Sequence, residues 1–167
     1  ELIDLMQQVP ALLYGFITIL GVLIGSFLNV VIYRLPVMME REWKSECAES
    51  FPEAVLKPDE EVFNLVVPRS RCPQCDHLIG SAENIPLLSW LLQKGRCKHC
   101  ACKISKRYPS IELLSGFLSL VVAYMIPFGW PLVFGLLFTW VLISLTFIDF
   151  DTMLLPDQLT LPLLWFG

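Results

Sequence analysis

The sequence has 167 residues, of which 55% are apolar and 17% charged, and its mean hydropathy is +0.62. Soluble domains hold about 45–50% apolar and about 25% charged residues, so this composition indicates a membrane protein and excludes a disordered chain. The formal net charge of −4 argues against a nucleic-acid-binding protein, for which a strongly basic surface is expected.

The first predicted element is a membrane-spanning helix near the start of the chain. Residues 11–33 carry no charge, and a helix of that length would cover about 34 Å, enough for a bilayer core of about 30 Å. No basic segment precedes this run and no small-residue cleavage site follows it, so we do not expect a signal peptide. We assign residues 1–33 to an N-terminal segment and a first transmembrane helix.

This first helix carries a face of small residues. Gly21 and Gly25 form a G-x-x-x-G motif, with Ser26 and Asn29 close by. Glycines at this spacing allow a second helix to approach closely, and the Asn29 amide can hydrogen-bond across such a contact. We interpret the motif as a helix-packing surface rather than as part of a catalytic site.

A polar segment, residues 34–109, follows the first helix. All 12 Lys and Arg residues lie between Arg34 and Arg107, and some lie close to each predicted membrane boundary. Lys and Arg concentrate on the cytoplasmic side of membrane proteins. We therefore expect the polar segment to face the cytoplasm, with the N-terminus on the opposite side.

Two C-x-x-C pairs lie within this polar segment. Tetrahedral zinc takes four soft ligands, and each C-x-x-C turn can supply two thiolates. Four thiolates leave no open position for water, and the reducing cytoplasm disfavours disulfides, so we predict a structural zinc site. The predicted ligands are Cys72, Cys75, Cys97 and Cys100. Three nearby residues remain alternative ligands: His77, His99 and Cys102.

The remainder of the chain is again apolar and is divided by Pro127, Gly129 and Pro131. Proline at a helix end is a stop signal, so two spans are predicted here. The predicted elements are a second transmembrane helix over 110–127, a third over 132–149, and over 150–167 a cytoplasmic turn with the start of a fourth helix. For Glu112 we expect a side chain that reaches the interface or pairs with Arg107, with a place lining a polar site as the alternative.

Three carboxylates interrupt the last apolar region. Asp149 directly follows a long uncharged run, and a carboxylate at membrane depth is a functional candidate because its burial in lipid is costly. Asp151 lies about 200° further around a continuing helix, so the two side chains would not share a face. Asp157 follows Pro156 and is predicted to cap the next helix. The sequence contains neither G-x-S-x-G nor H-E-x-x-H, so serine and zinc-dependent hydrolysis lack support.

Several short motifs occur in a fixed order along the chain. They are Gly25-Ser26-Phe27-Leu28-Asn29-Val30, Arg34-Leu35-Pro36, the two C-x-x-C pairs, Arg107-Tyr108-Pro109 with Glu112, Ile148-Asp149-Phe150-Asp151, and Leu155-Pro156-Asp157. In this order the chain resembles the type IV prepilin peptidases, bifunctional membrane enzymes of pilus assembly and type II secretion.

The resemblance implies an activity, a location and partners. Such an enzyme cleaves the short basic leader of prepilins and pseudopilins after a glycine, at the cytoplasmic face of the bacterial inner membrane. It then methylates the new N-terminus with S-adenosylmethionine as the methyl donor. Two alternatives remain open: a membrane-anchored zinc-knuckle module that binds partners without catalysis, and a peptidase without methyltransferase activity.

The resemblance also implies an aspartic peptidase with two catalytic carboxylates. The first falls on Asp149, and the second belongs to a G-x-G-D motif that this sequence does not contain. We therefore expect an N-terminal fragment that is inactive alone. The predicted fold is an all-α polytopic membrane protein with a small cytoplasmic zinc-knuckle domain between its first two transmembrane helices. The expected partners are prepilins, pseudopilins and the lipid bilayer, and no nucleic acid.

Overall fold

The structure is a computed structural model that describes residues 9–51, 62–72 and 74–166. Its elements are α2 (Pro10–Ser50), the 3-10 turn η1 (Ser81–Asn84), α3 (Leu88–Leu92), α4 (Arg107–Met125), α5 (Trp130–Thr152) and α6 (Asp157–Phe166). Within those residues there is no β-strand, only two isolated bridges. Three helices, α2, α4 and α5, are long and apolar enough to cross a membrane. The predicted all-α membrane fold is confirmed at this level.

Helix α2 is longer than the sequence suggested. The apolar run ends at Tyr33, but the helix continues through Pro36 to Ser50. The residues after Pro36 include no glycine or proline and many good helix formers, so the helix continues once the proline is passed. An ion pair one turn apart, Lys44 Nζ to Glu40 Oε1 at 2.8 Å, supports this extension. The polar segment expected to begin at residue 34 therefore begins as the charged half of α2.

Helices α2 and α4 meet at the predicted small-residue face. A Cβ atom added to Gly25 would lie 2.8 Å from the Glu112 Cα, and one added to Gly21 would overlap Ser119. Hydrogen bonds cross this contact: Ser115 Oγ donates to the Gly21 carbonyl at 2.7 Å, and Asn29 Nδ2 donates to the Tyr108 carbonyl at 3.2 Å. The close approach expected from G-x-x-x-G is confirmed.

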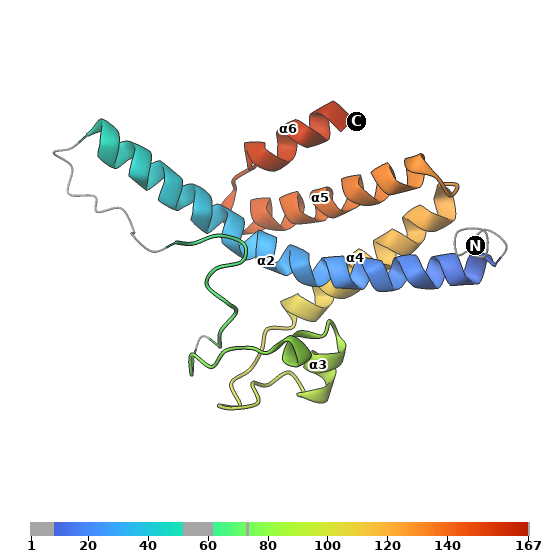
Figure 1. Ribbon diagram of the computed structural model, residues 1–167, viewed down its shortest axis with the longest axis horizontal. Helices are drawn as coiled ribbons and strands as arrows, with labels where there is room; N and C mark the ends of the chain where they lie inside the picture. The colour runs from blue at the N-terminus through green and yellow to red at the C-terminus, as the bar shows by residue number, and fades with distance from the viewer. Residues whose placement is uncertain (1–8, 52–61, 73, 167) are drawn as a thin grey trace.

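Helix α5 completes a three-helix bundle with α2 and α4 (Figure 1). The Trp140 indole N–H donates to Ser119 Oγ at 2.9 Å, which ties α5 to the small-residue face of α4. Apolar side chains fill the rest of the contact in two clusters, one of which includes the fully buried Ile148. Helix α5 ends at Thr152, one turn beyond Asp149, and α6 begins at Asp157 after a short turn.

The described residues between α2 and α4, 62–72 and 74–106, contain little regular structure and lie beside the bundle (Figure 1). Near its start, the buried Arg34 guanidinium of α2 donates to the carbonyls of Asn64 at 2.8 Å and Pro68 at 2.5 Å. Further along, the Leu87 N–H donates to Glu112 Oε2 of α4 at 2.7 Å. Two side chains of the bundle thus fix this segment in place.

Candidate functional site

The two C-x-x-C pairs form turns with the same backbone geometry. In the first turn, the Cys72 N–H donates to the His77 carbonyl and the Asp76 N–H donates to the Cys72 carbonyl, each at 2.9 Å. In the second, the Cys97 N–H donates to the Cys102 carbonyl at 2.8 Å and the Ala101 N–H donates to the Cys97 carbonyl at 2.9 Å. Both turns are thus closed by the same pair of hydrogen bonds.

The repeat extends to backbone conformation and to the flanking residues. Asp76 and Ala101 occupy the same place in the two turns, and both have a positive φ, 53° and 57°. An isolated bridge flanks each turn, Arg71 with Leu78 and Arg96 with Lys103. In this repeat Cys102 is the counterpart of His77, not of a C-x-x-C cysteine.

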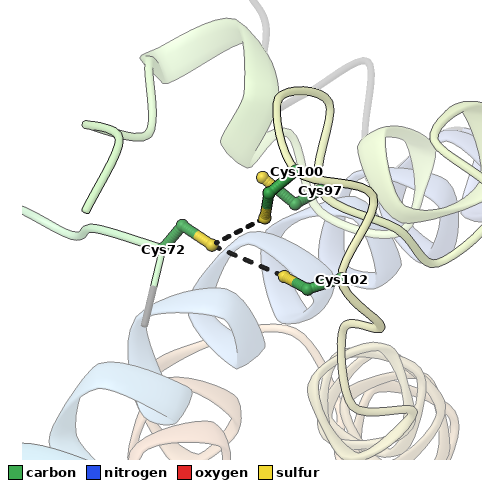
Figure 2. Close-up of side chains that lie close together, drawn as sticks. All are labelled: Cys72, Cys97, Cys100 and Cys102. Carbon is green, nitrogen blue, oxygen red and sulfur yellow. Dashed lines mark hydrogen bonds between the residues drawn. The ribbon is translucent and has the colours of Figure 1, made fainter. Parts of the chain in front are cut away.

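The turns bring cysteine sulfurs together (Figure 2). The Sγ atoms of Cys72, Cys97, Cys100 and Cys102 all lie within 4.8 Å of one another. Cys72 Sγ is 3.7 Å from Cys100 Sγ and 3.5 Å from Cys102 Sγ. Three of the four predicted ligands therefore meet, and Cys102, considered only as an alternative, lies with them.

The predicted fourth ligand, Cys75, lies at the edge of this group with an exposed side chain. The backbone N–H of His77 acts to lower the pKa of the Cys75 thiol. Desolvation and the neighbouring thiols of Cys72, Cys100 and Cys97 outweigh that effect and raise the pKa to about 12. Cys75 is thus close enough to interact with the other thiols. Either Cys75 or Cys102 could therefore be the fourth ligand of a metal ion.

The pKa values of the Cys72 and Cys102 thiols shift in opposite directions. Backbone N–H groups of Gln74 and Cys75 stabilise the Cys72 thiolate and lower its pKa to about 6. The thiols of Cys100 and Cys72, with desolvation, raise the pKa of Cys102 to about 12. Adjacent thiolates repel one another, so ionising all of them requires a cation among them. Converging sulfurs with N–H donors from the turns are a donor group that suits Zn²⁺.

The alternative ligands His77 and His99 form a separate group. Their ring centroids are 3.5 Å apart, and with the Glu83 carboxylate they bring three ligand atoms within 4.8 Å of one another. Glu83 lies 3.7 Å from His77 Nε2 and 3.7 Å from Lys98 Nζ. The imidazoles therefore interact with Glu83 and with each other rather than joining the cysteine cluster.

The carboxylates near the end of α5 have different surroundings. Both oxygens of Asp151 accept hydrogen bonds from the Arg107 guanidinium, one of them at 2.8 Å from Nη1, in a bidentate ion pair that joins α5 to the start of α4. The Asp149 side chain is exposed and has no hydrogen-bond or ion-pair partner in the described part of the chain. Asp151 thus serves as a structural link, and Asp149 keeps a carboxylate available for chemistry.

Asp157 and Glu112 differ from what the sequence suggested. Asp157 is the first residue of α6, where its negative charge suits the helix dipole, rather than a cap preceding it. Glu112 is buried on α4 and does not pair with Arg107, whose partner is Asp151. Its Oε2 accepts the N–H of Leu87, a residue with the unusual φ of 59°. The Arg107–Asp151 pair has no local sequence signal, since 44 residues separate its members.

Comparison with known protein families agrees with this arrangement. The bacterial peptidase A24 N-terminal domain matches residues 19–126, and the type IV leader peptidase family matches residues 136–167. The first match covers most of α2, the cysteine turns and α4. The second includes Asp149, Asp151 and Asp157.

Curated relatives are similar over almost the whole chain. A prepilin leader peptidase/N-methyltransferase of Aeromonas salmonicida is 55% identical over 99% of this chain and 57% of its own length. The proteins of that name from Pseudomonas aeruginosa and Neisseria gonorrhoeae are 47% and 51% identical, over 99% and 89% of this chain and 57% and 52% of their own lengths. The chain thus spans about half the length of these relatives. No solved structure matches it. By its family matches, the chain belongs to the bacterial A24 peptidases, the type IV leader peptidase family.

Proposed function

We propose that a protein carrying this chain is a prepilin leader peptidase and N-methyltransferase of the bacterial inner membrane. It would cleave the leader of type IV prepilins and type II secretion pseudopilins after glycine and methylate the new N-terminus. The names of the relatives support this activity. The observation that carries the proposal is the exposed carboxylate of Asp149 at the end of an apolar helix, with its neighbour Asp151 already paired.

In this proposal Asp149 is one of two catalytic carboxylates. One ionised carboxylate takes a proton from the attacking water while a second, protonated one polarises the scissile carbonyl. Close approach of two carboxylates drives their pKa values apart and creates these two roles. The second carboxylate would come from a G-x-G-D motif outside this sequence, so we propose that the 167 residues alone do not cleave.

The topology fits such a reaction. A prepilin holds its apolar helix in the bilayer with the leader in the cytoplasm, so the scissile bond lies near the inner interface. With the polar segment in the cytoplasm, the end of α5 that carries Asp149 lies at the same interface. We propose that Zn²⁺, held by Cys72, Cys97, Cys100 and either Cys75 or Cys102, supplies the cross-link that folds the segment beside this site. S-adenosylmethionine would supply the methyl group.

The experiment is a processing assay in membranes. A full-length protein that carries this sequence is expressed with a prepilin, as wild type and as Asp149→Asn, and the pilin product is weighed by mass spectrometry. We expect loss of the leader plus one added methyl group with the wild type. In the variant we expect cleavage to fall by about 10²–10⁴-fold, the usual contribution of proton transfer by a positioned side chain. Asp151→Asn is the matched control two residues away, with a much smaller expected effect.

Other outcomes would contradict specific parts of the proposal. Full cleavage by Asp149→Asn would move the catalytic role to another carboxylate. Cleavage without added methyl mass would indicate a peptidase that lacks methyltransferase activity. Absence of processing by the wild type would favour a zinc-knuckle module that only binds partners. Cleavage by the 167-residue chain alone would contradict the need for a second carboxylate from outside it.

A further inference from the structure

The residues that line two adjoining cavities place a groove between the charged half of α2 and the turn that joins α5 to α6. It consists of two adjoining cavities, of about 450 and 270 Å³, that share Trp43 and Leu154 as walls. The larger cavity falls within the range of ligand pockets, roughly 300–1,000 Å³. The groove exists only because α2 continues beyond Pro36, since Glu40, Glu42 and Trp43 all lie in that extension.

The charges along this groove are all of one sign. Glu40 and Asp151 line the larger cavity, and Glu42 and Asp157 line the smaller one. Among the described residues, no Lys, Arg or His lines either cavity. The nearby Arg41 does not line either cavity. Its guanidinium carbon lies 4.5 Å from the centroid of the Phe63 ring, in the polar segment.

Two of these carboxylates are paired and two are not. Asp151 is held by Arg107, and Glu40 pairs with Lys44 in a contact where both side chains are more than half exposed. An exposed pair of this kind is weak and exchanges readily with an incoming cation. Glu42 and Asp157 have no ion-pair partner in the described part of the chain. The groove therefore keeps an excess of negative charge.

The walls between these carboxylates are apolar. Trp43 is 45% exposed, and Pro36, Val37 and Leu154 line the same space. Apolar walls with carboxylates at the rim suit a lysine or arginine side chain, whose alkyl stem packs on apolar surface while its charge stays at the edge. An indole face adds attraction for such a cation.

The groove reaches the last turn of α5, next to the turn that carries Asp149, although Asp149 itself lines neither cavity. Thr152 lines the larger cavity and lies three residues after Asp149, which places the two side chains on the same side of α5. Asp151, on another side of the same turn, also reaches this cavity. A peptide held in the groove would therefore lie close to the Asp149 carboxylate.

We propose that this groove binds the positively charged residues of the peptide that the enzyme cleaves. The occupant is a short extended segment with lysine or arginine, whose cations meet Glu42 and Asp157 and whose side chain packs against Trp43. Binding there holds the segment that follows next to Asp149. This inference rests on the proposed function, because it identifies the groove as the leader-binding part of the same site.

The first test reverses one charge in a full-length protein that carries this sequence. Glu42→Lys is expected to raise KM for prepilin cleavage about fivefold, since an exposed charge pair contributes up to ~1 kcal/mol and reversal adds repulsion, and to leave kcat unchanged. A prepilin whose leader lysines are replaced by glutamate should be cleaved better by Glu42→Lys than by the wild type. A merely structural role for Glu42 would not produce this reversal of substrate preference. Glu42→Gln, with a smaller rise in KM, serves if the reversed variant does not fold.

The control for this test is a second charge reversal on α2, outside the groove. Glu46→Lys makes the same charge change one turn further along α2, where the side chain lines neither cavity, and it should leave KM unchanged. Equal effects of Glu42→Lys and Glu46→Lys would overturn the inference. A cross-linking experiment gives a second check, with a cysteine at position 42 (Glu42→Cys) and another in the prepilin leader. A position-42 cysteine that cross-links to its own chain and not to the leader would also overturn the inference.

A binding measurement separates this inference from the proposed function. Anisotropy of a fluorescent lysine-containing leader peptide, titrated with the full-length protein in detergent, requires no cleavage. Binding that weakens with added salt and in Glu42→Lys supports the groove even if no processing is seen. If neither added salt nor Glu42→Lys changes the affinity for the peptide, the inference about the groove is overturned, even if the wild type cleaves prepilin.

Discussion

The helix bundle and the cysteine-containing segment beside it are stabilised in different ways. Close packing stabilises the bundle. Helix α4 approaches α2 so closely that a Cβ atom at Gly25 would overlap the α4 backbone, and apolar clusters fill the remaining contacts. The segment over residues 62–106 has one short α-helix, α3, and one 3-10 turn, and it depends on single hydrogen bonds and on its thiols. We therefore expect the bundle to position Asp149 by packing alone, and the cysteine turns of the segment to depend on a metal ion in addition to their hydrogen bonds to the bundle.

The largest expected effect is the loss of the metal. Replacing Cys72 by Ser should reduce the zinc content from one per chain to none and unfold the cysteine turns, because structural zinc contributes about 10–16 kcal/mol at neutral pH. Atomic emission spectroscopy on the purified protein measures this directly. Cys47→Ser, which removes an exposed thiol of α2 outside the cluster, is the control and should keep its zinc. Unchanged zinc in Cys72→Ser would contradict the assignment.

A measurement of zinc affinity decides the fourth ligand. The repeat of the two turns makes Cys75 the counterpart of Cys100, so we expect Cys75→Ser to lower zinc affinity far more than Cys102→Ser does. Competition with a chromophoric chelator gives the two affinities. The opposite order would assign the site to the four sulfurs drawn together in Figure 2.

Enlarging the glycine face should weaken the bundle next. Gly25→Leu would force α2 and α4 apart and lower the free energy of unfolding by about 3 kcal/mol, as overpacking of a tight contact does. Thermal unfolding in detergent, followed by circular dichroism, measures the change. Gly15→Leu lies on the same helix with nothing within 4 Å of an added Cβ, so a matched loss there would refute packing as the cause.

The hydrogen bonds of Arg34, which join the bundle to the cysteine-containing segment, are expected to contribute less to stability. Arg34→Gln removes charged donors from the carbonyls of Asn64 and Pro68 and should cost about 2 kcal/mol, since a hydrogen bond to a charged group contributes about 1.5–3 kcal/mol. Limited proteolysis should then cut the segment around residue 64 faster while α4 and α5 stay intact. Equal sensitivity of all regions would indicate that Arg34 stabilises the whole fold.

The smallest effect is expected at the exposed pair of Arg107 and Asp151. A double-mutant cycle with Arg107→Gln and Asp151→Asn should give a coupling energy of about 1 kcal/mol, because partly exposed ion pairs are screened by solvent. Unfolding midpoints of the four proteins supply the cycle. Additive effects of the two substitutions would show that the pair contributes nothing to stability.

The sequence predicted the features that depend on local spacing. G-x-x-x-G at Gly21 and Gly25 predicted a close helix contact, and uncharged runs predicted three apolar helices, because both signals lie within one element. The C-x-x-C pairs predicted that Cys72, Cys97 and Cys100 would meet, since such turns present their thiols together. These parts of the fold follow from short-range patterns.

Most of the features that were missed depend on contacts distant in sequence. The length of α2 is an exception: the first helix was expected to end at Tyr33 with the uncharged run, but the helix-forming residues that follow continue it to Ser50. One partner of Glu112 is a backbone N–H, that of Leu87, which leaves no trace in the side-chain pattern. Cys102 joins the cluster only because its turn folds back towards Cys72. The groove between α2 and the α5–α6 turn follows from these tertiary arrangements and not from any motif.

Hydrogen–deuterium exchange of a full-length protein that carries this sequence, with and without a zinc chelator, tests the contrast between the two regions most directly. We expect chelation to expose the amides of residues 70–105 to rapid exchange, while the amides of α4 and α5, including those around Asp149, keep their protection. Simultaneous loss of protection in the segment and in both helices, or a segment that chelation leaves protected, would contradict this expectation.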